Sequence, residues 1–530
     1  MQALAHAGLR SVGWVRRITH LRPIAATALS ASSLALFLSA CALGPNYKPA
    51  AAPVPTKFKE LKGWKLATPS DALDRGNWWN LYRDKRLDVL MRQVEISNQN
   101  VAAQAAAYEQ ARAVIREAQA SLFPTLTGNY TATRTRTGPS VGSGGSGFGS
   151  SSGSTGGSGG RSSGGGGTYS TTYTPQLSGS WDLDVWGKVR RQIESDTSLA
   201  QASAADLANV KLSQQALLAT AYFNLLAADS LHDLLARTVE EYKRTLQIVQ
   251  NQYKAGYSVT SGDVATAQAQ VETTQAQEIN TGVVRAQYEH AIAMLTGRPP
   301  AELTVGHHEL TGTIPHIPVT IPSTLLERRP DIAQAERTMQ ADNALIGVAE
   351  AAFFPDISLS GVLQWIGKTP LPFSAAHEVW SLGAAASQPI FDGGLHSAQL
   401  DAARAVYWQS VATYRQTVLG ALQGVEDELA AIHYLSQQLA FQEAAVKDAR
   451  TAVNVYMNQF EAGTVAFTTV VTAEVTLLAD EETALTIRQN LFLASVTLIE
   501  DLGGTWDTTL LPTQKELQAS FSLLPQLPTQ

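Results

Sequence analysis

The chain has 530 residues, 16% of them charged and 7% aromatic, and its formal net charge is −7. An acidic chain offers no basic face to neutralise phosphates, which argues against a nucleic-acid-binding protein. The single cysteine, Cys41, excludes an intrachain disulfide and a cysteine-rich metal site.

The first forty residues have the pattern of a bacterial signal peptide. Four arginines precede a short apolar run at 24–38, which is too short for a comfortable membrane span and is followed by Leu-Ser-Ala-Cys at 38–41. This ending resembles a lipobox, so we expect residues 1–40 to be removed as a lipoprotein signal peptide and Cys41 to carry a lipid. A chance cysteine in an apolar run is the alternative. The Arg16–Arg17 pair fits twin-arginine export poorly.

After the signal peptide, the chain contains two copies of one arrangement of helices and strands. An aromatic-charged-Ala-Gly turn occurs at 253–256 and at 460–463, a spacing of 207 residues, and Gly297 pairs with Gly504 at the same spacing. Before the strands the spacing is 231, and the glycine- and serine-rich tract at 138–167 accounts for the difference as an exposed loop. Its Gly-x-Gly-x-x-Gly lacks the strand and the helix that flank a dinucleotide site.

In chain order, the predicted parts are a lipid-anchored extended segment at 41–85, a first repeat at 86–300, an inter-repeat segment at 301–323, a second repeat at 324–504 and a tail at 505–530. The first repeat is predicted to hold strands at 124–136 and 168–185, a long helix at 187–254 and a return helix at 263–296. The second is predicted to hold strands at 355–367 and 377–391, a long helix at 394–461 and a return helix at 470–502.

The two long helices carry apolar residues at alternating spacings of three and four. In the first helix these residues are Leu235, Val239, Tyr242, Leu246, Val249 and Tyr253, and the second helix repeats the pattern. A mean period of 3.5 residues predicts left-handed coiled-coil packing. Each proline-free run covers 68 residues, roughly 100 Å of helix, which is too long for a compact domain. A filamentous coiled coil is the alternative, and the intervening strands argue against it.

The expected strands alternate apolar and polar side chains. At 169–185 the odd positions are mainly apolar and the even positions polar, and 357–365 repeats this alternation. The pattern suits outer-membrane strands, or else a sheet on a soluble core; the signal peptide and lipobox favour the membrane. Four strands cannot close a barrel in lipid, so we predict a trimer that shares twelve strands. The predicted fold class is α+β, mainly α, with a coiled-coil helical barrel, an outer-membrane β-barrel and a tandem repeat.

Several motifs, in their order and spacing, resemble the TolC/OprM family of outer-membrane efflux channels, in particular its NodT-like lipoprotein branch. They lie at 38–50, 78–91, 122–130, 177–192, 325–336 and 388–394, together with the two Ala-Gly turns. The resemblance covers essentially the whole mature chain. It implies a homotrimeric duct anchored in the Gram-negative outer membrane and extending into the periplasm, with an equatorial belt formed by the chain ends and the inter-repeat segment.

The resemblance also implies a passive channel in a tripartite efflux system for small molecules and drugs. A periplasmic adaptor would join it to an inner-membrane pump of the RND type, with ABC or MFS pumps less favoured. A duct for ABC-driven protein secretion is the alternative, and a lipid-anchored structural coiled coil is a second. Since the sequence holds no zincin motif and no P-loop, we expect no enzyme and no cofactor beyond the lipid on Cys41.

The two glycine turns are the main candidate site, because glycine readily takes the left-handed conformation that ends a helix. The resemblance implies that they form the periplasmic tip and receive the adaptor through Gly256, Tyr257, Ser258, Gly463, Thr464 and Val465. Relatives often constrict this end with aspartates after the second turn, where this chain has threonines. The predicted aperture lining is Asp263, Thr468, Thr469 and Thr472. For Asp263 the alternative is a solvated acid at a helix start, favoured by the helix dipole.

Arg134 and Arg136 lie near the outer end of the first predicted strand. Their guanidinium groups suit the phosphates of lipopolysaccharide. Solvated loop residues are the alternative interpretation.

Overall fold

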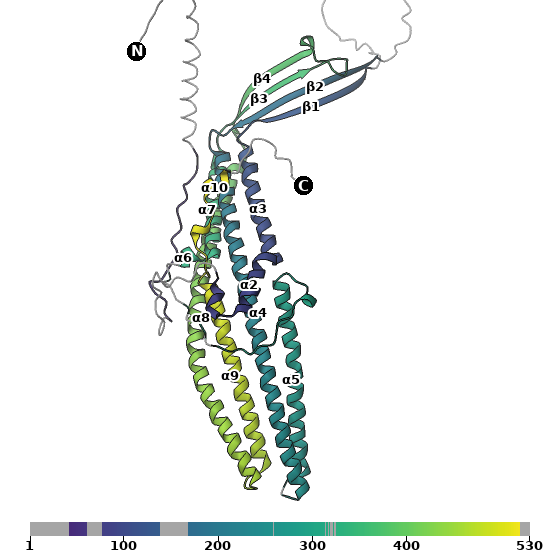
Figure 1. Ribbon diagram of the computed structural model, residues 1–530. Coiled ribbons are helices and arrows are strands. Elements are labelled where there is room, and N and C mark those ends of the chain that lie inside the picture. The colour runs from purple at the N-terminus through teal and green to yellow at the C-terminus, as the bar shows by residue number, and fades with distance from the viewer. Residues whose placement is uncertain are drawn as a thin grey trace, which may run out of the picture. The chain divides into compact units, whose positions relative to one another are not determined.

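The computed structural model describes residues 42–60, 77–137, 168–257, 259–312, 314–315, 317, 322 and 325–519 (Figure 1). The predicted signal peptide, Cys41, the glycine- and serine-rich tract and Ser258 lie outside these residues. The chain divides into two units. One, the sheet unit, comprises 122–191 and 347–393 with the residues up to Gly44; the other, the helical unit, comprises 45–121, 192–346 and 394 onward.

The sheet unit holds one antiparallel sheet with the strand order β1-β2-β3-β4 (Figure 1). Strand β1 is Thr125–Thr137, β2 is Thr168–Leu183, β3 is Asp356–Trp365 and β4 is Glu378–Ser387. The central pair, β2 and β3, joins the two sequence repeats, because Gln176 of β2 pairs with Gln364 of β3. Sequence repeats therefore share one sheet rather than forming two.

The register brings the apolar positions of all four strands onto one face. Leu126 of β1 lies opposite Gly179 of β2, and Gly361 of β3 lies opposite Leu382 of β4. A Cβ atom added at Gly361 would lie 3.2 Å from Leu382 Cδ2, so the edge-strand leucine covers the central glycine. Because side chains alternate between faces, this register makes the alternation seen in the sequence into a continuous apolar surface.

Strand β4 ends earlier than the predicted strand at 377–391, and the prediction is wrong for the last four residues. Pro389 has no N–H to donate to a ladder, and Gly393 and Gly394 adopt φ values of 64° and 91°. These residues form the turn into the following helix instead. Strand β3 also stops short of 367, although Gly367 forms an isolated bridge with Tyr173.

Two pairs of long helices dominate the chain. Helix α4 is Lys188–Ala255 and α5 is Ser261–Leu295; α8 is Leu395–Glu461 and α9 is Phe467–Asp501. The return helices α5 and α9 each have 35 residues and begin two and three residues before the predicted starts. Of the predicted apolar stripe on α4, Leu235, Val239, Tyr242 and Val249 are buried, whereas Tyr253 at the end of the helix is 48% exposed. None of the described helices combines the length and apolar character needed to cross a membrane.

Shorter helices complete the helical unit. They are η2 at Trp78–Tyr82, α2 at Lys85–Ser97, α3 at Gln99–Ala120, η3 at Pro300–Glu302, α6 at Leu325–Arg328, α7 at Pro330–Ala351, η6 at Thr508–Leu510 and α10 at Gln514–Gln518; η5, Ala375–His377, precedes β4 in the sheet unit. Helix η2 lies inside the segment that was predicted to be extended.

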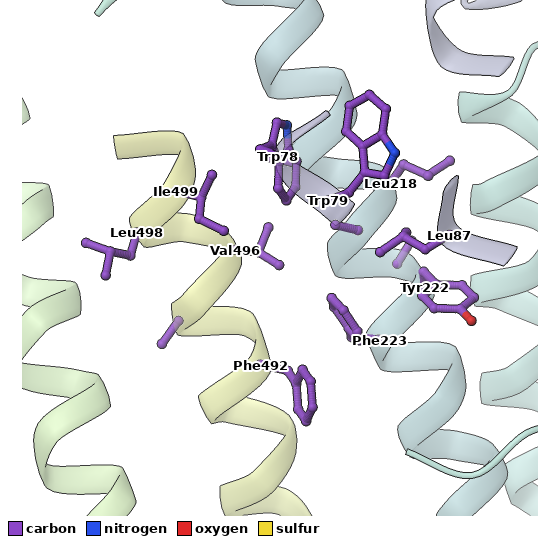
Figure 2. Close-up of a cluster of buried hydrophobic side chains, with 14 of the residues drawn as sticks. Trp78, Trp79, Leu87, Leu218, Tyr222, Phe223, Phe492, Val496, Leu498 and Ile499 are labelled. Atoms are coloured by element: carbon purple, nitrogen blue, oxygen red, sulfur yellow. The ribbon is translucent and has the colours of Figure 1, made fainter. Parts of the chain in front are cut away.

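The main hydrophobic core fixes η2 and α2 against the long helices. Trp78 and Trp79 are 2% and 1% exposed and pack in one cluster with Tyr222 of α4 and Phe492 of α9 (Figure 2). Both indole N–H groups donate hydrogen bonds, from Trp78 to Gln215 Oε1 at 3.2 Å and from Trp79 to Asp88 Oδ1 at 3.0 Å. Large buried aromatic groups with satisfied N–H donors stabilise such a core strongly.

The inter-repeat segment is held to α4 through a buried carboxylate. Asp229 has no exposed side-chain surface; its Oδ1 accepts from Arg285 Nε at 2.7 Å, and its Oδ2 accepts from the backbone N–H of His308 at 2.9 Å. His307 lies between Asp229 and Asp233, and its hydrogen bond to Asp233 raises the pKa of the imidazole. His307 is nonetheless a surface residue, since its side chain is 48% exposed.

Candidate functional site: the two helical turns

The two helical hairpins end in turns of the same geometry. In the first, Gly256 has φ 79°, its N–H donates to Tyr253 O, and the Tyr257 N–H donates to Gln252 O. In the second, Gly463 has φ 74° and the N–H groups of Gly463 and Thr464 make the equivalent bonds at 2.9 Å. This is the Schellman arrangement that ends a helix through a left-handed residue. A Cβ at either glycine would meet nothing within 4 Å. The positive φ angle, and not a lack of space, is therefore the reason that these positions favour glycine.

The turns differ in how the next helix begins. Thr260 caps α5 in a capping box with Asp263: the Thr260 N–H and Oγ1 both donate to Asp263 Oδ2 at 2.8 Å. Helix α9 begins after Ala466, which provides no side-chain cap. Counted from the glycine, the first turn is one residue longer. In space, Asp263 therefore corresponds to Thr469, because each is the third residue of its helix.

The predicted aperture residues carry little charge. Thr468 and Thr472 are exposed, and the Thr472 hydroxyl donates to Thr468 O at 2.8 Å within the helix. The first turn of α9 has no acidic residue. Asp263 is the one carboxylate of the predicted set, and its oxygen is occupied in capping α5. The structure thus favours the helix-start interpretation of Asp263, while its place in an aperture stays a prediction.

A small hydrophobic cluster joins the two hairpins near their turns; we call it the tip cluster. Its buried members come from all four long helices: Val249, Ala267, Phe460, Phe467 and Val470. The Phe460 and Phe467 rings lie 5.5 Å apart between centroids. Val259 and Val465 of the turns pack against the cluster, whereas Tyr257 is 69% exposed. The turn residues therefore divide into an inner set that packs and an outer set that a partner can reach.

Behind the tip cluster lies a buried carboxylate that links α9 to α4. Glu474 is 7% exposed, and its Oε1 accepts a hydrogen bond from Thr245 Oγ1 at 2.8 Å. A cavity of about 340 Å³ adjoins it between α4, α8 and α9. Burial, and secondarily the negative charge of Glu241, raise the pKa of Glu474 to about 7, although the Thr245 hydrogen bond opposes this.

Sequence reasoning missed Glu474, but a signal was present. Along α9 the buried positions Phe467, Val470, Glu474 and Leu477 follow the spacing of an apolar stripe. A glutamate at one of these positions must find a partner or be protonated. The pattern could have been recognised by asking which charged residue interrupts a stripe.

Comparison with known proteins decides the family. Residues 90–298 and 321–504 match the profile described as "Outer membrane efflux protein". The chain belongs to this family. The two matched segments correspond to the two repeats, which confirms the tandem repeat and the α+β, mainly α fold.

Relatives of similar length support this assignment. The chain is 28% identical to the cation efflux system protein CusC of Escherichia coli O6:H1, covering 89% of this chain and 97% of CusC. It is 28% identical to the pyoverdine export outer membrane protein OpmQ of Pseudomonas aeruginosa, covering 91% and 97%. The solved outer-membrane channel OprN superposes with a TM-score of 0.77 at 27% identity, over 88% of this chain and 99% of OprN.

The resemblance to outer-membrane efflux channels is confirmed by these findings. The protein is an efflux channel of the Gram-negative outer membrane and not an enzyme. The alternative of a protein-secretion duct is not favoured, because the matched proteins are efflux and export channels for other cargo. Figure 1 shows the four long helices of such a channel as two hairpins, α4–α5 and α8–α9.

Proposed function

We propose that three copies of the chain form one passive duct for small molecules, with a shared twelve-stranded barrel and a barrel of long helices. The observation that supports this is the sheet itself. In the described strands, β1 and β4 are the two edges, and one face of the sheet is apolar. Unpaired edges are not tolerated in lipid, so the edges pair between neighbouring copies.

In this duct the two turns form the periplasmic tip and receive a periplasmic adaptor. The exposed residues Gly256, Tyr257, Gly463 and Thr464 supply the contact surface, while Val465 anchors its turn to the tip cluster. The inner-membrane partner is an RND-type pump rather than an ABC or MFS pump, in line with the OprM-like resemblance. The cargo is set by the pump, since CusC and OpmQ are named for cations and for pyoverdine.

Cysteine crosslinking tests the docking surface. Thr464→Cys at the exposed tip should crosslink to a cysteine in the hairpin of an adaptor that supports export. Ile279→Cys, on a 70% exposed residue of α5 away from the turns, is the matched control and should not crosslink. Equal crosslinking at both positions, or none at Thr464 with a functional adaptor, would exclude the turns as the docking site.

We also propose that Cys41 carries the lipid anchor, on the strength of the Leu-Ser-Ala-Cys sequence after the signal-like segment. One acyl chain anchors weakly and several anchor well, so the lipid assists a barrel already held in the membrane. Cys41→Ser should abolish incorporation of labelled palmitate and leave channel assembly intact. Continued labelling of the variant would disprove the assignment.

A further inference from the structure

Two arginines continue the apolar face of the sheet beyond its aromatic border. On β1, Leu126, Gly128, Tyr130 and Ala132 share one face, and the next positions on that face are Arg134 and Arg136. Both are in register with β2, opposite Thr171 and Tyr169. They are strand residues, which rules out their interpretation as loop residues.

The distance from Arg134 to the other end of the apolar face matches the height of the apolar band of an outer-membrane barrel. Trp181 of β2 lies ten residues from Thr171, the residue opposite Arg134. Ten residues at about 3.3 Å each span roughly 33 Å, and a strand tilt of about 40° reduces this to roughly 25 Å, the height of an outer-membrane apolar band. Tyr130 and Tyr173, with ring centroids 6.4 Å apart, form the aromatic border just before the arginines.

Both guanidinium groups lie near one ring. Arg134 Cζ is 5.1 Å and Arg136 Cζ 5.5 Å from the centroid of Tyr169. Stacking on an aromatic ring orders a guanidinium and leaves its N–H edge available to acceptors. Among the described residues, no carboxylate forms an ion pair with either arginine. Two adjacent, exposed positive charges on one face therefore form a site whose charge and geometry suit an anion.

The orientation of the strands identifies the membrane leaflet. The opposite end of β2, at Leu183, leads within five residues into α4, whose hairpin forms the periplasmic part of the channel. The arginine end is therefore the outward end. Phosphate is the anion that matches guanidinium geometry in the headgroup layer there.

We propose that Arg134 and Arg136, ordered by Tyr169, bind the phosphate groups of a lipid in the outer leaflet of the outer membrane. The proposal rests on the barrel described above. The ligand is a phosphorylated lipid whose headgroup binds the two arginines and whose acyl chains lie along the apolar face; it is not free phosphate.

Lipid titration of the purified full-length channel tests this proposal. Native mass spectrometry in a non-ionic detergent would compare bis-phosphorylated lipid A with its dephosphorylated form. We expect the double variant Arg134→Gln/Arg136→Gln to lose at least tenfold in affinity for the phosphorylated lipid and to be unchanged toward the other. Lys368→Gln, which removes an exposed charge from the β3–β4 connection, is the matched control and should bind like wild type.

Two further variants keep the proposal testable if the glutamine variant fails to assemble into a channel. Arg134→Lys/Arg136→Lys keeps both charges and should retain most of the affinity, whereas Tyr169→Leu keeps both arginines and should lose part of it. Any of three results would overturn the proposal. The glutamine variant could bind the phosphorylated lipid as tightly as wild type, the wild type could bind both lipids equally, or inorganic phosphate could displace the lipid completely. Bilayer conductance of the glutamine variant should match wild type; absence of conductance in wild type would instead contradict the duct.

Discussion

Gly297→Ala is expected to prevent stable assembly of the channel. Gly297 follows α5 with φ 68°, and a Cβ there would lie 2.1 Å from the backbone oxygen of Ser97, the last residue of α2. The contact is fixed on both sides, since Ser97 Oγ donates to Thr296 O and Asn98 Nδ2 donates to Leu295 O. Relieving the clash means separating two backbones, so we expect a loss of about 3 kcal/mol or more.

The matched control is Gly256→Ala, which has a similar φ of 79° but no atom within 4 Å of the added Cβ. It should cost about 1 kcal/mol, the penalty of the left-handed conformation alone. Gly503→Ala, whose Cβ would lie 2.0 Å from Arg328 O, should behave like Gly297→Ala. The losses of stability are measured by thermal unfolding of each solubilised variant and by the amount of each variant in the outer membrane. Similar losses for Gly256 and Gly297 would contradict the close contact.

The second large effect is a pH dependence of the tip through Glu474. Its pKa of about 7 in the folded chain exceeds the ordinary 4.5, so the folded state binds the proton more tightly. Stability is therefore highest below pH 4.5 and falls as pH rises through 7, by roughly 3 kcal/mol. An ionised carboxylate between α4 and α9 weakens their contact behind the tip cluster. We expect the tip to open more readily at pH 8 than at pH 5.5.

Hydrogen exchange at the start of α9, corrected for its intrinsic pH dependence, measures this effect. The opening equilibrium should rise about thirtyfold between the two pH values in wild type, the equivalent of roughly 2 kcal/mol, because part of the total loss already lies below pH 5.5. Glu474→Gln should remove the pH dependence, because the amide stays neutral. Glu461→Gln, on an exposed acid at the same end of the hairpin, is the control and should preserve it. A pH dependence that persists in Glu474→Gln would exclude this carboxyl as its source.

Local periodicity was sufficient to locate most of the fold. The stripe through Val239, Tyr242 and Val249 predicted one face of a long helix, and these residues are buried. Alternation along β2 predicted an apolar face, which the register of the sheet extends across four strands. Where a single residue interrupts the alternation, the strand ends earlier than predicted, as β4 does before Pro389.

The equivalence of the repeats shows a limit of sequence matching. A spacing of 207 pairs Gly297 with Gly504, but the backbone bonds at the end of α5 match those around Gly503. The turn between α4 and α5 carries one more residue after its glycine, which shifts the return helix by one. In a periodic, alanine-rich sequence, a single inserted residue cannot be recognised from the pattern of side chains.

The sequence alone determined the two repeats, the long helices and the membership in a channel family, because these depend on composition, spacing and neighbouring residues. The signal segment stays a prediction from the sequence. Tertiary structure decided the pairing of β2 with β3, the burial of Glu474 against Thr245 and the stacking of Arg134 and Arg136 on Tyr169. Each of the latter depends on which distant segment packs opposite a residue. The pairing of distant strands and the burial of a single charge both depend on these long-range contacts, and no local sequence pattern encodes them.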